Sequence, residues 1–171
     1  LGVDTNSDGN IQNTEASSVT SLNLYQSNIS DLTGIESFTN LTQLNCSSNA
    51  LTSLTLTTLT NLTTLYCNSN LLATLDVSGL SALSTIECYG NQLTSINLSG
   101  LTGLSILKCN VNSLTSLNVS DCTALTYLDF SQNQISTINL ASNSNLITLA
   151  GNQNNLTSLN ISNLSNLRTL Y

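Results

Sequence analysis

The stretch LTQLNCSSNALTSLTLTTLTN, from Leu41 to Asn61, decides the fold of this chain because it recurs with a constant step of 21 residues. A repeat of roughly 20–50 residues is a structural unit that cannot bury its apolar face alone. Copies therefore stack side by side, and each contacts only its neighbours. The period predicts an elongated stack of coils instead of a compact globule. The leucines that open successive copies are Leu41, Leu62, Leu83, Leu104, Leu125, Leu146 and Leu167.

The pattern within each copy is L-x-x-L-x-C-x-x-N-x-L-T-x-L-x-L-x-x-L-x-N/G. Its first half matches the leucine-rich-repeat signature, with cysteine in place of the third leucine. Apolar and polar residues alternate in both halves, which is typical of strands that bury one face. We therefore expect a mainly β leucine-rich-repeat solenoid with 21-residue coils and little helix. It would have a parallel sheet on one face and short strands or extended segments on the other.

The five cysteines follow the repeat. Four share position 6 of successive copies, and Cys122 stands where other copies have leucine. Cysteine in a core behaves as a small hydrophobic residue, so we expect buried free thiols in place of disulfides or a metal site. Cysteine usage therefore does not fix the redox compartment. The position-6 cysteines are Cys46, Cys67, Cys88 and Cys109, and other coils have Leu24, Phe130 and Gly151 there. The predicted core residues of the first copy are Leu41, Leu44, Cys46, Leu51, Leu54, Leu56 and Leu59.

An asparagine follows the first strand of each copy from Leu41 onward. Backbone groups buried at such a turn need hydrogen-bond partners, and a side-chain amide offers both donors and an acceptor. We expect these amides to form a ladder that serves the backbone of their own coil and of the next coil. The asparagines are Asn49, Asn70, Asn91, Asn112, Asn133 and Asn154.

Residues 4–15, DTNSDGNIQNTE, match the twelve-residue calcium loop D-x-[DN]-x-[DN]-G-x-x-x-x-x-E. Calcium binds six to eight oxygens, which a tightly wound loop offers at alternate residues. Gly9 permits the sharp turn, and Ile11 is expected to point inward and anchor the loop on the first coil. The predicted ligands are Asp4, Asn6, Asp8, Asn10 through its backbone carbonyl, Gln12 through a water, and Glu15.

This loop resembles those of EF-hands and dockerins, in a single copy without the paired helices of a calcium sensor. The alternative interpretation is a solvated turn rich in Asn and Asp. Solenoids need caps because a bare terminal coil exposes its core and an unpaired strand edge. We therefore expect calcium to be the cofactor of a structural cap on the first coil, in preference to a regulatory switch.

We divide the chain into three parts. Residues 1–18 form the calcium-loop cap, residues 19–40 a divergent first coil, and residues 41–171 six full repeats with the start of a seventh. Asn28 of the divergent coil lies one position later than the ladder asparagines. No capping sequence follows Tyr171, so we expect this chain to be part of a longer protein.

The order of calcium loop, divergent coil and cysteine-bearing repeats resembles bacterial secreted or cell-surface leucine-rich-repeat proteins. These include the internalin-like group and, in particular, the surface repeat proteins of the Bacteroidota. The resemblance covers nearly the whole chain, through the repeat pattern and the segment ISDLTGIESFTNL at residues 29–41. It implies a bacterial protein with an extracellular binding or adhesion role, and it identifies no ligand.

Composition excludes several classes of function. The net charge is −7 and the only basic residues are Lys108 and Arg168, whereas nucleic-acid binding needs a basic surface. No apolar run approaches the roughly 18 residues of a membrane span. There is no histidine, zinc spacing or glycine-rich phosphate loop, so we do not expect an enzyme. Polarity supplied by Ser, Thr and Asn suits a secreted or cell-surface protein.

The outward residues of the first strands predict a binding face. All five tyrosines lie at such positions, and tyrosine with a solvated hydroxyl is favoured at binding surfaces. Glu87, Lys108 and Asp129 form a charged row on three successive coils, which could alternatively be only a surface ion ladder. A protein or a carbohydrate would be the ligand. The predicted ligand-binding residues are Tyr25, Tyr66, Glu87, Tyr89, Lys108, Tyr127 and Asp129.

The opposite face supports two other interpretations. Its outward rows are regular and almost uncharged, so they could order water as ice-binding solenoids do. The repeats could also form a purely structural spacer in a larger surface protein, with solvated residues copied by duplication. The rows are Ser53, Thr74, Ser95, Ser116, Thr137 and Ser158; Thr55, Asp76, Asn97, Asn118, Asn139 and Asn160; and Thr57, Ser78, Ser99, Ser120, Ala141 and Ser162.

Overall fold

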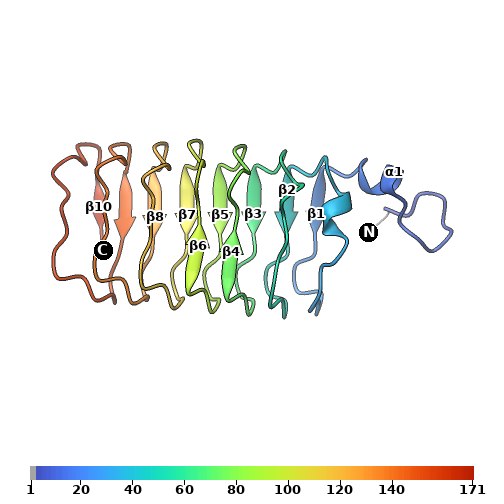
Figure 1. Cartoon of the computed structure of the whole chain (residues 1–171), viewed down its shortest axis with the longest axis horizontal. Helices are drawn as coiled ribbons and strands as arrows, with labels where there is room; N and C mark the ends of the chain where they lie inside the picture. Colours follow the sequence, from blue (N-terminus) through green and yellow to red (C-terminus); the bar gives the residue numbers. More distant parts are fainter. Residues whose placement is uncertain (1–2) are drawn as a thin grey trace.

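A computed structural model describes residues 3–171, so Leu1 and Gly2 of the predicted cap lie outside the described residues. The chain forms a row of stacked coils, and the amino-terminal segment projects from one end of the row (Figure 1). The predicted leucine-rich-repeat solenoid with almost no helix is confirmed.

Parallel strands from successive coils form one long sheet with eight strands. Residues 21 apart pair across it, for example Leu44 with Leu65 and Leu65 with Ile86. The strands, in their order in the sheet, are β1 (Ser21–Asn23), β2 (Gln43–Asn45), β3 (Thr64–Tyr66), β5 (Thr85–Glu87), β7 (Ile106–Lys108), β8 (Tyr127–Asp129), β9 (Thr148–Ala150) and β10 (Thr169–Leu170).

In the part of the chain that the structure describes, the opposite face is extended backbone with one pair of strands, β4 (Thr74–Asp76) and β6 (Ser95–Asn97). The helical segments within residues 3–171 are α1 (Asn13–Ala16) and one 3₁₀ turn, η1 (Ile35–Ser37). None of the helices in this part of the chain has the length and apolar content needed to span a membrane.

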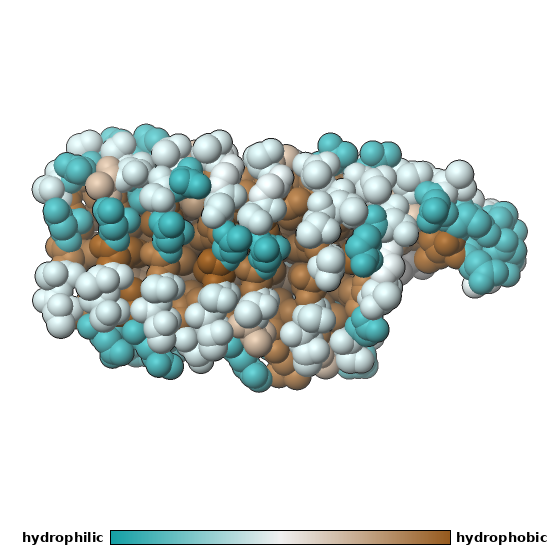
Figure 2. Space-filling view, viewed as in Figure 1, coloured by the Kyte–Doolittle hydropathy of each residue, from teal (hydrophilic) through white to brown (hydrophobic). Residues whose placement is uncertain are grey.

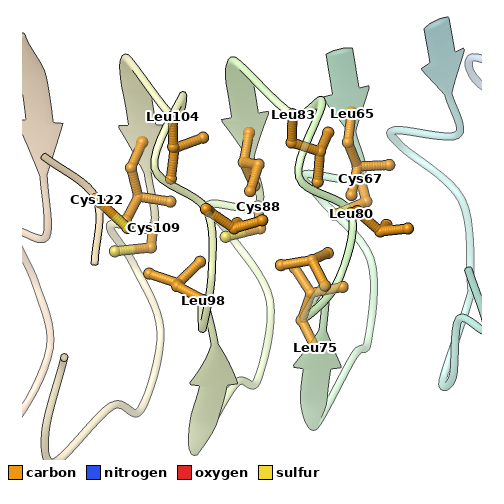
Figure 3. Close-up of a cluster of buried hydrophobic side chains, with 14 of the residues drawn as sticks. Leu65, Cys67, Leu75, Leu80, Leu83, Cys88, Leu98, Leu104, Cys109 and Cys122 are labelled. Atoms are coloured by element: carbon orange, nitrogen blue, oxygen red, sulfur yellow. The ribbon is translucent and has the colours of Figure 1, made fainter. Parts of the chain in front are cut away.

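The core is a column of leucines and cysteines between the two faces (Figure 3). Six of the seven core residues predicted for the first repeat are buried, and Leu54 is partly buried against them. All five thiols are free and buried. Loss of hydration on burial disfavours the thiolate, which raises the pKa of Cys46 to about 12 and that of Cys122 to about 11.

The asparagine ladder is present, but it runs in the opposite direction to the prediction. In Asn70, Nδ2 donates to the carbonyl of Cys67 in its own coil at 3.1 Å and to that of Cys46 in the preceding coil at 3.0 Å. Its Oδ1 accepts from the N–H of Leu51 in that preceding coil at 3.0 Å. Each coil is therefore completed by the coil after it. The same contacts are made by Asn49, Asn91, Asn112, Asn133 and Asn154.

A residue with positive φ stands directly before every ladder asparagine. Left-handed backbone turns the chain sharply at the end of the strand. Val111 is unusual among these residues because it is β-branched, and its φ is 55°. The set comprises Ser48, Ser69, Gly90, Val111, Gln132 and Gln153.

A second ladder, which the sequence did not suggest, runs along the start of strands β2, β3, β5, β7 and β8 of the long sheet. The hydroxyl at position 2 of a coil donates to the carbonyl at the same position of the preceding coil. Thr63, for example, donates through Oγ1 to the carbonyl of Thr42 at 3.0 Å. Like the asparagines, these hydroxyls point from one coil to the coil before it. The other donors are Thr42, Ser84, Ser105 and Thr126.

An asparagine occupies one repeat position that is otherwise apolar. Asn143 occupies the place that Cys122 holds in the preceding coil, and it is completely buried. Its Nδ2 donates to the carbonyls of Val119 at 3.0 Å and Cys122 at 2.9 Å, while its Oδ1 has no hydrogen-bond partner within residues 3–171. The amide thus ties two coils together in a position where the repeat otherwise uses an apolar contact.

The amino-terminal segment covers the first coil only in part. An apolar pocket of about 460 Å³ lies between them. Ile11 was expected to anchor the loop, but it lies at this pocket with 53% of its surface exposed. Val3, before the loop, and Ala16, at the end of α1, are buried instead. Hydrophobic atoms are visible on the projecting segment (Figure 2).

Burial of the thiols predicts that native protein resists thiol reagents. Only the thiolate reacts rapidly. The raised pKa keeps the thiolate population small, and burial keeps the reagent away from the sulfur atoms. Ellman's reagent should label almost no thiol in native protein and all five after denaturation. Rapid labelling of the native protein would contradict the buried column.

Phe130 and Gly151 should behave as a compensating pair. A β-carbon on Gly151 would overlap Cζ of Phe130 and lie 3.0 Å from its Cε1. We therefore expect Gly151→Cys to reduce the free energy of unfolding by about 1–3 kcal/mol through overpacking. Adding Phe130→Cys should recover part of the loss, because it restores the cysteine column.

Denaturant unfolding of the wild type, both single variants and the double variant would measure this coupling. Purely additive effects of the two changes would contradict it.

Candidate functional site

The amino-terminal loop is wound tightly around its own side chains. Ser7 has φ of 60° and Gly9 of 86°, and these two residues reverse the chain. Asp4 accepts hydrogen bonds from the N–H groups of Gly9 at 2.9 Å and Asp8 at 3.2 Å. Asp8 in turn accepts from the N–H of Asn10 at 2.9 Å. The carboxylates of the predicted ligand set therefore face the inside of the turn.

Glu15 closes the loop from the first turn of α1. Its carboxylate accepts from the N–H of Thr5 at 2.7 Å and from that of Gln12 at 3.1 Å. The hydrogen bond from Gln12, followed by that from the Thr5 side chain, lowers the pKa of Glu15. Gln12 also donates to Asp8 at 2.6 Å and accepts from Asn6 at 3.2 Å. One network thus joins all the side chains predicted to bind calcium.

This loop fits calcium in its donor chemistry. Its oxygens come from carboxylates and amides, which are hard ligands that suit this ion. Within residues 3–171, however, no three His, Cys, Asp or Glu side chains converge on one point. The side chain of Gln12 accepts from that of Asn6 and donates to the carboxylate of Asp8.

The outward row of the long sheet brings most of the predicted binding residues into register. Tyr66 pairs with Glu87, Glu87 with Lys108, and Lys108 with Asp129 on consecutive strands. Tyr25 follows β1, so it is separated from β3 by a whole strand. The β1 residue in register with this row is Asn23, and Tyr25 lies two residues after it, so Tyr25 is not part of the row.

Lys108 is the centre of the cluster. Its Nζ lies 2.8 Å from Oε1 of Glu87 and 5.7 Å from the centroid of the Tyr127 ring. The hydrogen bond with Glu87 raises the pKa of Lys108, and Tyr127 and Tyr89 act in the same direction. The amine is therefore charged at neutral pH and held in one orientation, with 33% of the side chain exposed.

Asp129 does not join this ion pair. Its Oδ1 accepts from the N–H of Ser131 at 3.0 Å and from the Ser131 hydroxyl at 2.6 Å. Asn45 makes the same turn with Ser47 in an earlier coil. The charged row is thus one ion pair and one separate carboxylate, not a continuous ion ladder.

The carboxyl-terminal coils form a hollow of about 540 Å³ on the same face, which sequence reasoning did not identify. The row that holds Tyr66, Glu87, Lys108 and Asp129 continues with Ala150, which has no long side chain. This interruption of the row is the signal that could have located the hollow. Its lining consists of Asn110, Tyr127, Asp129, Ser131, Gln132, Ala150, Asn152 and Tyr171.

The regular row on the opposite face has a structural reason. Asn97 Oδ1 accepts from the N–H of Ser99 at 3.2 Å, which closes a turn of the backbone. The equivalent residues in the neighbouring coils do the same, so their oxygens are already engaged by the protein. They are Asp76, Asn118, Asn139 and Asn160.

Comparison with protein families matches residues 8–151 to the leucine-rich-repeat domain of the endo-β-N-acetylglucosaminidase EndoS. The chain belongs to this leucine-rich-repeat family. The match ends before the last 20 residues of the repeats, and it shows nothing of the catalytic part of that enzyme. Comparison with curated protein sequences gives no significant match.

Solved structures similar to this leucine-rich-repeat domain include two internalins of Listeria monocytogenes. Internalin C2 has a TM-score of 0.86 and 28% identity, over 98% of this chain and 79% of its own. The functional domain of InlJ, described as including a cysteine ladder, has a TM-score of 0.51 and 28% identity. The match covers 94% of this chain but only 50% of that InlJ domain.

A leucine-rich-repeat protein of Leptospira interrogans is also similar, with a TM-score of 0.59 and 26% identity. The match covers 80% of this chain and 44% of that protein. The chain thus has the fold of internalin-type domains, and it spans half or less of two of these relatives.

Proposed function

We propose that this domain is a non-enzymatic binding or adhesion module of a secreted or cell-surface bacterial protein. It recognises a protein or a carbohydrate through the tyrosine-bearing face of the long sheet. The observation that carries the proposal is the fixed position of Lys108 between Glu87 and the Tyr127 ring. The likeness to internalins supports a role in binding.

The Lys108 cluster has the properties of a preformed recognition surface. Its charge is held by a short hydrogen bond and an aromatic ring, so less side-chain entropy is lost when a ligand binds. Tyrosine is common among the residues that dominate the binding energy of interfaces. The residues come from consecutive strands of a rigid sheet, which fixes their spacing. Repeat proteins use such extended surfaces for their partners.

Calcium has a structural role in this proposal. The ion would bind Asp4, Asn6, Asp8 and Glu15, with the carbonyl of Asn10 and a water held by Gln12. Bound calcium neutralises carboxylates that share one turn, and it holds α1 against the first coil. The apolar pocket between the amino-terminal segment and the first coil offers a surface against which this segment could pack.

The binding face is tested by the double variant Tyr66→Ala/Tyr89→Ala. Loss of two interface tyrosines at about 1 kcal/mol or more each should weaken ligand binding at least tenfold. Ligands would be sought with a glycan array and a cell-surface protein pull-down, and affinities measured by calorimetry. Thr74→Ala/Ser95→Ala, on the opposite face, is the control. Equal affinities of wild type and Tyr66→Ala/Tyr89→Ala would reject these two tyrosines as ligand-binding residues.

Calcium binding is tested by thermal unfolding across a calcium titration. A ligand at about one hundred times its Kd stabilises the folded state by about 2.7 kcal/mol, so the melting temperature should rise with calcium. Asp8→Ala should remove this rise. Asp76→Asn is the matched control, because other coils have asparagine at that position. If the melting temperature of the wild type does not change with calcium, the proposed calcium cap is rejected.

A further inference from the structure

The hollow over β8, β9 and β10 exists because one residue is small. At the same strand position, earlier coils carry Tyr66, Glu87, Lys108 and Asp129, whereas β9 ends in Ala150. Ala150 is 6% exposed and forms the floor. Tyr127, from the coil before that of Ala150, and Tyr171, from the coil after it, also line the hollow.

The walls of the hollow carry planar polar groups with free bonding capacity. Asn110, Gln132 and Asn152 each contribute a side-chain amide. Their backbone groups join the hydrogen bonds between coils, but no hydrogen bond within residues 3–171 engages these three amide side chains. Asp129 uses Oδ1 for Ser131, which leaves Oδ2 available. The hollow thus offers donors and acceptors beside two aromatic rings.

The charges around the hollow argue against an anionic ligand. None of its lining residues is basic. The nearest cation, Lys108 on the neighbouring strand β7, is already paired with Glu87 and lies over the aromatic ring of Tyr127. Asp129 adds a negative charge, and the whole chain carries −7. Phosphate, sulfate, sialic acid and acidic peptides would all be repelled.

We propose that this hollow is a binding subsite for a neutral saccharide. The C–H face of a pyranose ring would pack on Tyr127 or Tyr171, because an aromatic side chain combines apolar surface with a polar edge. Its hydroxyl groups would pair with the amides of Asn110, Gln132 and Asn152 and with Oδ2 of Asp129. An apolar peptide side chain would leave these polar groups without partners, which is unfavourable. This inference rests on the proposed binding function and assigns it a ligand class.

The test fills the hollow without disturbing the sheet. Ala150→Glu and Ala150→Lys place at this position residues that the equivalent positions of β5 and β7 already hold, so both variants should fold and melt like the wild type. The probe is an array of neutral, sialylated and sulfated oligosaccharides, followed by calorimetry with the best neutral hit.

We expect the wild type to prefer neutral saccharides, and both Ala150 variants to bind at least tenfold more weakly. Loss with either sign of charge identifies occlusion and not electrostatics. Thr74→Glu and Thr74→Lys, on β4 of the opposite face, are the controls and should bind normally. Tyr127→Ala should also weaken binding, and its far-ultraviolet circular dichroism verifies folding.

The outcomes separate this inference from the proposed function. If no neutral saccharide binds, or if the Ala150 variants bind like the wild type, the saccharide subsite is overturned. The binding function still stands in that case if a protein ligand is captured and lost with Tyr66→Ala/Tyr89→Ala. If neither kind of ligand depends on this face, both the inference and the proposed function fall.

Discussion

The structure depends on side chains that satisfy the backbone of the coil before their own. At each turn after a strand, buried N–H and C=O groups would otherwise lose their water partners, and each such loss costs on the order of 1–3 kcal/mol. The ladder asparagine supplies both kinds of partner in one side chain. The hydroxyl ladder adds a further bond at the start of the strand. Because both ladders run toward the amino terminus, each coil is complete only when the next coil has stacked on it.

This constraint explains why the inside of the solenoid varies so little. A core side chain packs against the equivalent side chain of the adjacent coil, one strand spacing away. A larger side chain in one coil therefore needs a smaller one at the same position of the neighbouring coil. Phe130 fits only because the next coil has Gly151 beneath the ring. Asn143 shows the same dependence for a polar group, since its amide donates to two carbonyls around the preceding coil's Cys122.

We place the proposed binding function on the outward positions of the long sheet, because the two ladders do not use these side chains. Even there, Asp129 and Asn45 give one oxygen to a turn of the backbone. In our proposal, the ligand would contact the residues around the Lys108 ion pair and those lining the hollow at Ala150. On the opposite face, the asparagine row closes turns, which gives its regularity a reason other than the ordering of water.

The sequence by itself determined the fold, the buried cysteines and the asparagine ladder. Each follows from the 21-residue repeat, because residues 21 apart occupy equivalent positions in adjacent coils. It also located the tyrosine face by alternation alone. Only the tertiary structure decided that the ladder points to the preceding coil, that Ile11 stays at the surface and that Lys108 turns to Glu87 and not to Asp129. It also revealed the hollow at Ala150. These features depend on the direction of individual side chains and on gaps between coils, which residue spacing does not encode.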